Sequence, residues 1–166
     1  MVSETQIYLA LKKKLPKKGW ILVGGEPPDG TNSMPRIELK DENNISKGSK
    51  GSKKIDLLFF KEGYFLLLEL KEKYNFSDVK KLNEITENKK WRKAFMKALE
   101  EKRALELKNI PIDQEKYIQS TQFLIKSIAY SEGKSLLEDF VTFVINEEGI
   151  KLNFGSKMPD PIKRLF

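Results

Sequence analysis

The stretch Ile55–Lys71, with the sequence IDLLFFKEGYFLLLELK, indicates the fold most directly. Two apolar runs, 55–60 and 65–70, flank the segment Lys61-Glu62-Gly63-Tyr64. The glycine can supply the positive φ that a tight turn needs. The pattern therefore predicts a β-hairpin.

The length of the hairpin turn determines which side chains share a face of the sheet. A two-residue turn at 62–63 and a four-residue loop at 61–64 give the same register, in which Asp56 lies opposite Glu69. Lys71 lies on the same face, because side chains alternate along a strand. Four apolar side chains also share this face: Leu58, Phe60, Phe65 and Leu67. A three-residue loop would instead put Asp56 and Glu69 on opposite faces.

The remaining pattern indicates a mixed α/β domain. Helices are expected at 3–15, 77–105 and 134–138. Ser3 would cap the first helix and Pro16 would stop it. Ser77-Asp78 would cap the second helix, which is expected to break near Asn88. Strands are expected at 20–23, 36–40 and 122–128, and a second hairpin joins 140–145 to 150–154. The segment 41–54 reads as a loop. We expect one domain over 1–166.

Composition excludes several kinds of chemistry. The chain has 166 residues with no His and no Cys. A Ser-His-Asp triad, a thiol nucleophile, an iron–sulfur cluster and an ordinary zinc site are therefore ruled out. An enzyme with this composition would use carboxylates, Lys, Tyr or Ser, together with an oxygen-liking metal such as Mg²⁺.

Asp56, Glu69 and Lys71 form the group to which such chemistry points. Directly opposed carboxylates, with Cβ atoms ~5 Å apart, repel each other unless a cation lies between them. Mg²⁺, for which Mn²⁺ would substitute, meets that need. A neighbouring lysine stabilises charge on a phosphate under attack. The alternative interpretation is an ordinary solvated hairpin face whose charged pairs give modest stabilisation.

The segment Ile55-Asp56, followed by Glu69-Leu70-Lys71 at the end of an apolar strand, resembles the PD-(D/E)XK nuclease superfamily. That superfamily includes restriction endonucleases and archaeal Holliday-junction resolvases. The resemblance implies a restriction-endonuclease-like core at about 3–128, with a central mixed sheet flanked by helices. Residues 129–166 would then be a C-terminal extension of the same domain.

The resemblance also implies roles for individual residues. Asp56 and Glu69 would be metal ligands, joined by the backbone carbonyl of Leu70, and Lys71 would be the catalytic lysine. Glu4 corresponds to an acidic residue that the family often places on its first helix. Ile55 departs from the pattern, because it stands where the motif has proline.

A second, literal match to the motif lies earlier in the chain. Pro28-Asp29 precedes Glu38-Leu39-Lys40, but Asp29 is surrounded by Gly, Pro and Asn. Catalytic groups need rigid supports, and no apolar strand holds Asp29. We therefore rank this set below the hairpin.

Charge and the hairpin together predict the partners. The net charge is +7, with a pI near 9.4, which favours a polyanion such as double-stranded DNA. The Gly/Ser-rich segment before Asp56 carries lysines that would either contact phosphates or keep a flexible linker solvated, namely Lys47, Lys50, Lys53 and Lys54. A homodimer is expected, since two sites are needed to cut two strands. No apolar run approaches ~18 residues, so we expect no membrane span and a cytoplasmic protein.

These observations predict a Mg²⁺-dependent DNA endonuclease, most simply a type II restriction-like enzyme. A junction resolvase or another structure-specific nuclease is the first alternative. A non-catalytic nucleic-acid-binding module or subunit is the alternative from a different class.

Overall fold

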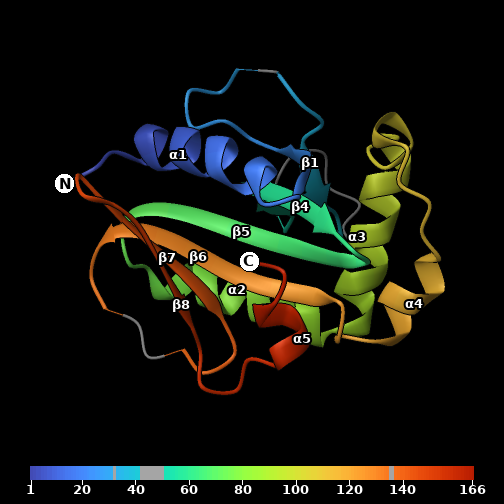
Figure 1. Ribbon diagram of the computed structural model, residues 1–166. Helices are drawn as coiled ribbons and strands as arrows, with labels where there is room; N and C mark the ends of the chain where they lie inside the picture. Colours follow the sequence, from blue (N-terminus) through green and yellow to red (C-terminus); the bar gives the residue numbers. More distant parts are fainter. Residues whose placement is uncertain (32, 42–50, 135–136) are drawn as a thin grey trace.

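The computed structural model describes residues 1–31, 33–41, 51–134 and 137–166. Six strands form the main sheet: β1 (Ile21–Gly25), β4 (Leu57–Lys61), β5 (Tyr64–Lys73), β6 (Leu124–Glu132), β7 (Val141–Asn146) and β8 (Gly149–Phe154). Their order is β1-β4-β5-β6-β7-β8 (Figure 1). The pairs β5–β6 and β6–β7 are parallel and the other pairs antiparallel. The fold is therefore mixed α/β, as predicted.

Helices cover both faces of this sheet (Figure 1). On one face, α1 (Glu4–Lys17) and α5 (Asp160–Lys163) pack with Leu66, Leu68 and other even-numbered residues of β5. On the other face lie α2 (Phe76–Glu87), α3 (Lys89–Glu101) and α4 (Gln114–Gln119), which contact a second apolar cluster. A short 3₁₀ turn, η1 (Glu106–Lys108), connects α3 toward α4.

The β4–β5 hairpin has the predicted register. Lys61 pairs with Tyr64, and the ladder continues without a slip to Leu57 and Leu68. The turn consists of Glu62 and Gly63, with φ values of 48° and 86°. Two positive φ values are the signature of the type I′ turn, which matches the twist of the flanking strands.

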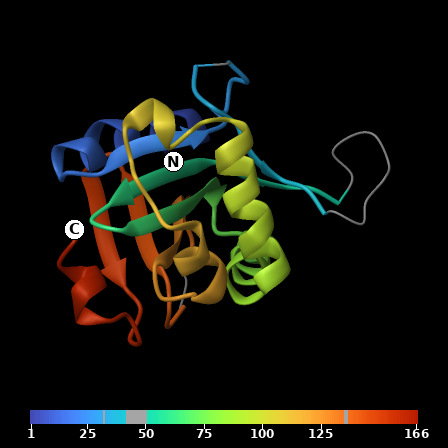
Figure 2. The same ribbon diagram turned by 90° about the vertical axis from the view of Figure 1, so that its right-hand side faces the viewer.

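The chain before the hairpin differs from the prediction. The expected strand 55–60 is divided at Asp56, and β3 (Lys53–Ile55) pairs instead with β2 (Ile37–Leu39) in a separate two-stranded sheet. Figure 2 shows this β2–β3 ribbon running beside α3. The expectation of a loop up to residue 54 is wrong at 53–54, because β2 supplies a pairing partner that no local pattern reveals. Residues 42–50 of that expected loop lie outside the described residues.

The helix boundaries differ from the predictions in two places. Ser3 caps α1 in a capping box with Gln6, as expected, but Pro16 lies inside the last turn and the helix ends at Lys17. Proline in a last turn loses one hydrogen bond without ending the helix. The cap of α2 is Asn75, rather than Ser77-Asp78.

The predicted break at Asn88 is confirmed. Asn88 has extended φ and ψ values of −102° and 118°, and its side chain accepts a hydrogen bond from the Lys90 N–H. It thus ends α2 and caps α3 at once, since an extended residue cannot continue a helix.

The C-terminal third of the chain contains elements that the sequence pattern missed. The helices α4 and α5 have six and four residues, too short for a helical period to stand out. The second hairpin is confirmed as β7–β8, with Asn146 paired to Gly149. Of the expected helix at 134–138, residues 135–136 lie outside the described part, and Leu137 and Glu138 are not helical. No helix in the described residues is long and apolar enough to cross a membrane.

The hairpin turn allows a first test. Glu62 holds a left-handed conformation that costs a non-glycine residue about 1 kcal/mol, whereas asparagine tolerates it. We expect Glu62→Asn to raise the free energy of unfolding by about 0.5–1 kcal/mol, measured by urea titration. Glu147→Asn is the matched control, because neither Glu147 nor Glu148 in the β7–β8 turn has a positive φ. This variant should give no gain. Equal gains in both variants would contradict this account of the turn.

Candidate functional site

Asp56 lies where the chain passes from the β2–β3 ribbon into the main sheet. Its Oδ2 accepts a hydrogen bond from the Leu70 N–H at 2.8 Å, across the end of the β4–β5 ladder. Its own carbonyl accepts from the Glu26 N–H at 3.0 Å. A Cβ at Gly25 would lie 2.2 Å from that carbonyl, so only glycine permits the close approach. Asp56 is therefore fixed on two sides by backbone.

Glu69 is the most buried carboxylate near Asp56, with 1% of its surface exposed. Its Oε2 lies 2.7 Å from the Lys81 ammonium, whereas its Oε1 is buried without a hydrogen-bond partner among the described residues. Burial raises the pKa of the Glu69 carboxyl well above its usual value, and the Asp56 charge adds to this. The Lys81 charge lowers the same pKa but does not cancel the effect.

Lys71 lies two residues further along β5, among carboxylates from α1, from α2 and from the junction between β3 and β4. Burial lowers the pKa of the Lys71 ammonium, but the charges of Asp78, Asp56 and Glu4 outweigh it, and the net shift is upward. Lys71 is therefore firmly cationic in this structure. Such a group suits electrostatic stabilisation better than removal of a proton.

Glu4 and Asp78 complete the group. Burial raises the pKa of both carboxyls, while the Lys71 charge lowers both. Because Asp56 also appears among the charges acting on each, these side chains share one electrostatic environment. We define the carboxylate site by these side chains: Glu4, Asp56, Glu69, Lys71, Asp78 and Lys81.

The carboxylate site lies at the carboxyl end of β5, toward the N-terminus in Figure 1. Glu4 is in the first turn of α1 and Asp78 in the first turn of α2, so both helices begin at this edge. Helix N-termini carry partial positive charge and favour anions nearby. The edge where parallel strands end is also where α/β sheets commonly hold their ligands.

The donor set can be tested against a divalent metal. Glu69 Oε1 lies in the site with Asp56 and has no hydrogen-bond partner among the described residues, so it is an oxygen ligand that fits a hard cation such as Mg²⁺. The described residues contain no group of three or more acidic side chains already arranged around an ion position. Two carboxylates suffice for Mg²⁺, which keeps several waters or takes substrate phosphates.

The predicted set is thus brought together in part. Asp56, Glu69, Lys71 and Glu4 share the site, and the Leu70 N–H holds Asp56. The metal-binding role of the Leu70 carbonyl stays a prediction. The competing match does not assemble in the described structure: Asp29 is exposed and bonds the Thr31 N–H, while Glu38 accepts from Ser52.

The predicted phosphate-binding lysines are not alike. Lys53 pairs with Glu84 at 2.7 Å and lies over the Trp91 ring, and Lys54 lies 3.8 Å from Glu26. Both are therefore engaged within the fold. Lys47 and Lys50 lie outside the described residues.

Sequence reasoning missed the roles of Asp78 and Lys81. It took Asp78 only as part of a helix cap. They are three residues apart on α2, which places them on one helix face. That spacing, in a helix directly after the Glu69-Leu70-Lys71 strand, is the signal that could have found them.

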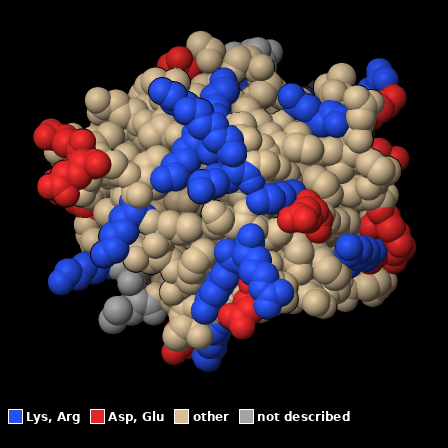
Figure 3. All heavy atoms as spheres, in the orientation of Figure 1, with Lys and Arg blue, Asp and Glu red and all other residues tan. Residues whose placement is uncertain are grey.

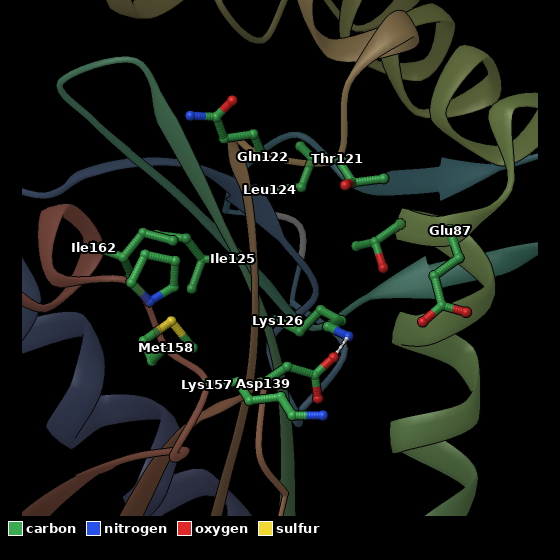
Figure 4. Close-up of a pocket in the computed structure, with 12 residues that line it drawn as sticks. Glu87, Thr121, Gln122, Leu124, Ile125, Lys126, Asp139, Lys157, Met158 and Ile162 are labelled. Carbon is green, nitrogen blue, oxygen red and sulfur yellow. Dashed lines mark hydrogen bonds and ion pairs between the residues drawn. The ribbon is translucent and has the colours of Figure 1, made fainter.

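A separate cavity of about 300 Å³ lies at the other end of β6 (Figure 4). Its wall includes Lys126, which pairs with Asp139 and donates to Asn83 at 2.8 Å. Met158 and Ile162 close its apolar side. Its lining includes no member of the carboxylate site, so this cavity is not part of that site.

A scan against protein-family models gives no match, and comparisons with curated proteins and with solved structures give none either. Function is therefore inferred from the geometry and chemistry of this chain.

Glu69 allows a test of the site that needs no substrate. A carboxyl with a raised pKa stabilises the fold at low pH, and this contribution is lost as the pH rises from the ordinary value of about 4.3 through the raised one. Glu69→Gln keeps an oxygen for Lys81 and has no such loss. We expect its free energy of unfolding to exceed that of wild type near neutral pH, because the glutamine carries no charge that burial disfavours.

The measurement is urea unfolding of both proteins between about pH 4 and pH 8. The difference should shrink toward acid pH. Glu147→Gln, which alters an exposed carboxylate in a turn, is the control. If the free energies of unfolding of wild type and Glu69→Gln changed in parallel with pH, the pKa of Glu69 would not be raised by the fold.

Proposed function

We propose that this chain is a Mg²⁺-dependent DNA endonuclease of the PD-(D/E)XK type, most simply a restriction-like enzyme that acts as a homodimer. The observation that carries the proposal is the buried Glu69 carboxylate with an unpartnered oxygen, beside the backbone-anchored Asp56. Buried carboxylates with a raised pKa are common at functional sites, and they also occur in structural ion pairs. The hairpin resemblance supports the same reaction.

The carboxylates would hold the metal. Asp56 and Glu69 are the ligands proposed for Mg²⁺, which would supply charge neutralisation and Lewis acidity at the phosphate. The Leu70 N–H keeps the Asp56 carboxylate at the end of the ladder. Lys81 balances the Glu69 charge in the structure described, with Nζ also donating to the Lys54 carbonyl at 2.8 Å.

Lys71 would act on the substrate. Its ammonium would orient the attacking water and offset the charge that develops on the phosphoryl oxygens. Hydrolysis adds one water across the P–O bond, so one product end carries a phosphate and the other a hydroxyl. Asp78 and Glu4 would keep Lys71 protonated and in place through their charges.

A cleavage assay tests this proposal. Wild-type protein should nick and linearise supercoiled plasmid in Mg²⁺ and be inactive in EDTA. Removal of a preorganised charged group commonly costs about 100-fold or more in rate. We therefore expect Glu69→Ala and Lys71→Ala to lose activity by at least that factor, measured as initial rates.

The matched control for Lys71→Ala is Lys73→Ala, because Lys73 is an exposed lysine two residues further along β5. Unfolding midpoints of all variants separate lost chemistry from lost structure. Cleavage that persists in either site variant would overturn the assignment.

One observation favours a different function. The Lys81 ammonium already occupies Glu69 Oε2 at 2.7 Å, as in a purely structural ion pair. A nucleic-acid-binding module with a coincidental cluster would have this feature too. Binding of DNA or RNA by wild type, with no metal-dependent cleavage of duplex, single-stranded or RNA substrates, would favour that module.

The substrate distinguishes the two nuclease proposals. A restriction-like enzyme needs only an unbranched duplex, so linear and branched DNA carrying the same arms should be cut at similar rates. A junction resolvase would cut a four-way junction and leave the matched linear duplexes intact. Gel analysis of both substrates in Mg²⁺ decides between them, and we expect cleavage of the linear duplex.

A further inference from the structure

The second half of α1 and its C-cap residue carry a dense set of exposed lysines, which we call the α1 lysine face. Its members are Lys12, Lys13, Lys14, Lys17 and Lys18. Between Thr5 and Gly25 the chain has no Asp or Glu. None of these lysines forms an ion pair with any described residue, whereas Lys53, Lys81 and Lys126 each have an acidic partner.

Helix stability explains only part of this arrangement. Lys14 and Lys17 lie in the last turn of α1, where cations interact favourably with the helix dipole. Lys12 lies over the Tyr8 ring, 5.5 Å from its centroid, whereas Lys13 and Lys17 are one turn apart on the same side of the helix. Like charges at that spacing repel each other, so the fold alone gives no reason for the whole group.

Neighbouring elements extend the basic surface. Lys61 donates to the carbonyls of Lys18 and Leu165, each at 2.6 Å, which ties the end of α1 to the C-terminal segment. That segment adds the exposed Lys163 and Arg164. In Figure 3 basic side chains gather at the centre of the face over α1, and acidic ones lie around them, at the left end, where the β7–β8 turn lies in Figure 1, and toward the right edge.

The chemistry of α1 favours a phosphate backbone over a lipid surface. A membrane-binding helix presents an exposed apolar side for insertion, together with its lysines. The apolar side of α1 is instead packed on the sheet, with Ile7, Leu11 and Leu15 at most 2% exposed. Leu9 is the exposed large apolar residue of this helix.

We infer that the α1 lysine face binds the phosphate backbone of a DNA duplex. This inference rests on the proposed function for its choice of DNA. At 1.5 Å per residue, Lys17 lies about 20 Å along the helix from Glu4, which belongs to the carboxylate site. A duplex carries one charge per ~1.7 Å of axis, so a DNA segment that spans both positions presents about twelve phosphates.

The test is duplex binding in EDTA, where no cleavage occurs. Fluorescence anisotropy of a labelled duplex of about 20 base pairs is measured over a range of NaCl concentrations. The variant Lys13→Gln/Lys14→Gln/Lys17→Gln should bind roughly tenfold or more weakly, and the slope of log K against log salt should fall by about 2.7, at ~0.9 per lost contact. Circular dichroism verifies that the fold is retained.

The matched control is Lys93→Gln/Lys97→Gln/Lys102→Gln, which removes three exposed lysines on and next to α3 and changes the net charge equally. It should keep most of the affinity and slope. Equal losses in the two variants, or an unchanged α1 variant, would overturn the inference, as would a wild type that binds no duplex. Binding of the protein to phosphatidylserine vesicles with no duplex binding would assign the face to a membrane.

The outcomes separate this inference from the proposed function. If Glu69→Ala abolishes cleavage but the α1 variant binds DNA like wild type, the proposed nuclease activity is supported and the proposed DNA-binding role of the α1 lysine face is wrong. If wild type does not cleave DNA but its DNA binding depends on the α1 lysines, the proposed role of the α1 lysine face is supported and the proposed nuclease activity is wrong.

Discussion

The register of the β4–β5 hairpin determines almost everything else in this structure. Glu62 and Gly63 close the turn in a conformation that fixes Lys61 opposite Tyr64. Odd-numbered residues of β5 then face α2 and α3, while even-numbered ones face α1. A slip of one residue would exchange the two sets and bring Glu69 into the apolar cluster under α1, away from Lys81. The apolar content of both faces therefore protects the position of one carboxylate.

Burial of the Glu69 carboxylate is unfavourable. Taking an ionised carboxylate from water into a protein interior costs several kcal/mol, which a single partner offsets only with good geometry. Lys81 supplies one such partner, yet the pKa of Glu69 remains raised, so burial outweighs the attraction. A second cation beside the Glu69 carboxylate would lower this pKa further. A purely structural pair would gain by satisfying both oxygens of Glu69, and only one is satisfied among the described residues.

The sequence predicted the parts of the site that depend on local geometry. Asp56, Glu69 and Lys71 could be related because one turn sets their register. Asp78 and Lys81 could not, because their place depends on how α2 docks on the sheet after β5. The division of the strand at Asp56 could not be predicted either. Ile55 packs on the α2 side of the sheet and Leu57 on the α1 side, although residues two apart in one strand would share a side. The reason is that β3 pairs with β2 instead of continuing into β4.

The distribution of charge gives the net value of +7 a more specific meaning. The carboxylate site is itself acidic, because the carboxylates of Glu4, Asp56, Glu69 and Asp78 outnumber the ammonium groups of Lys71 and Lys81. By itself it would repel a phosphate, so attraction of a polyanion must come from elsewhere on the surface. The lysines of α1 lie up to about 20 Å away along the helix. That separation exceeds the Debye length of about 8 Å at physiological salt, so the acidic edge does not cancel their field. The proposed function would therefore divide the two tasks along one helix, with the polyanion attracted by the lysines near the end of α1 and the metal held by the acidic site where α1 begins.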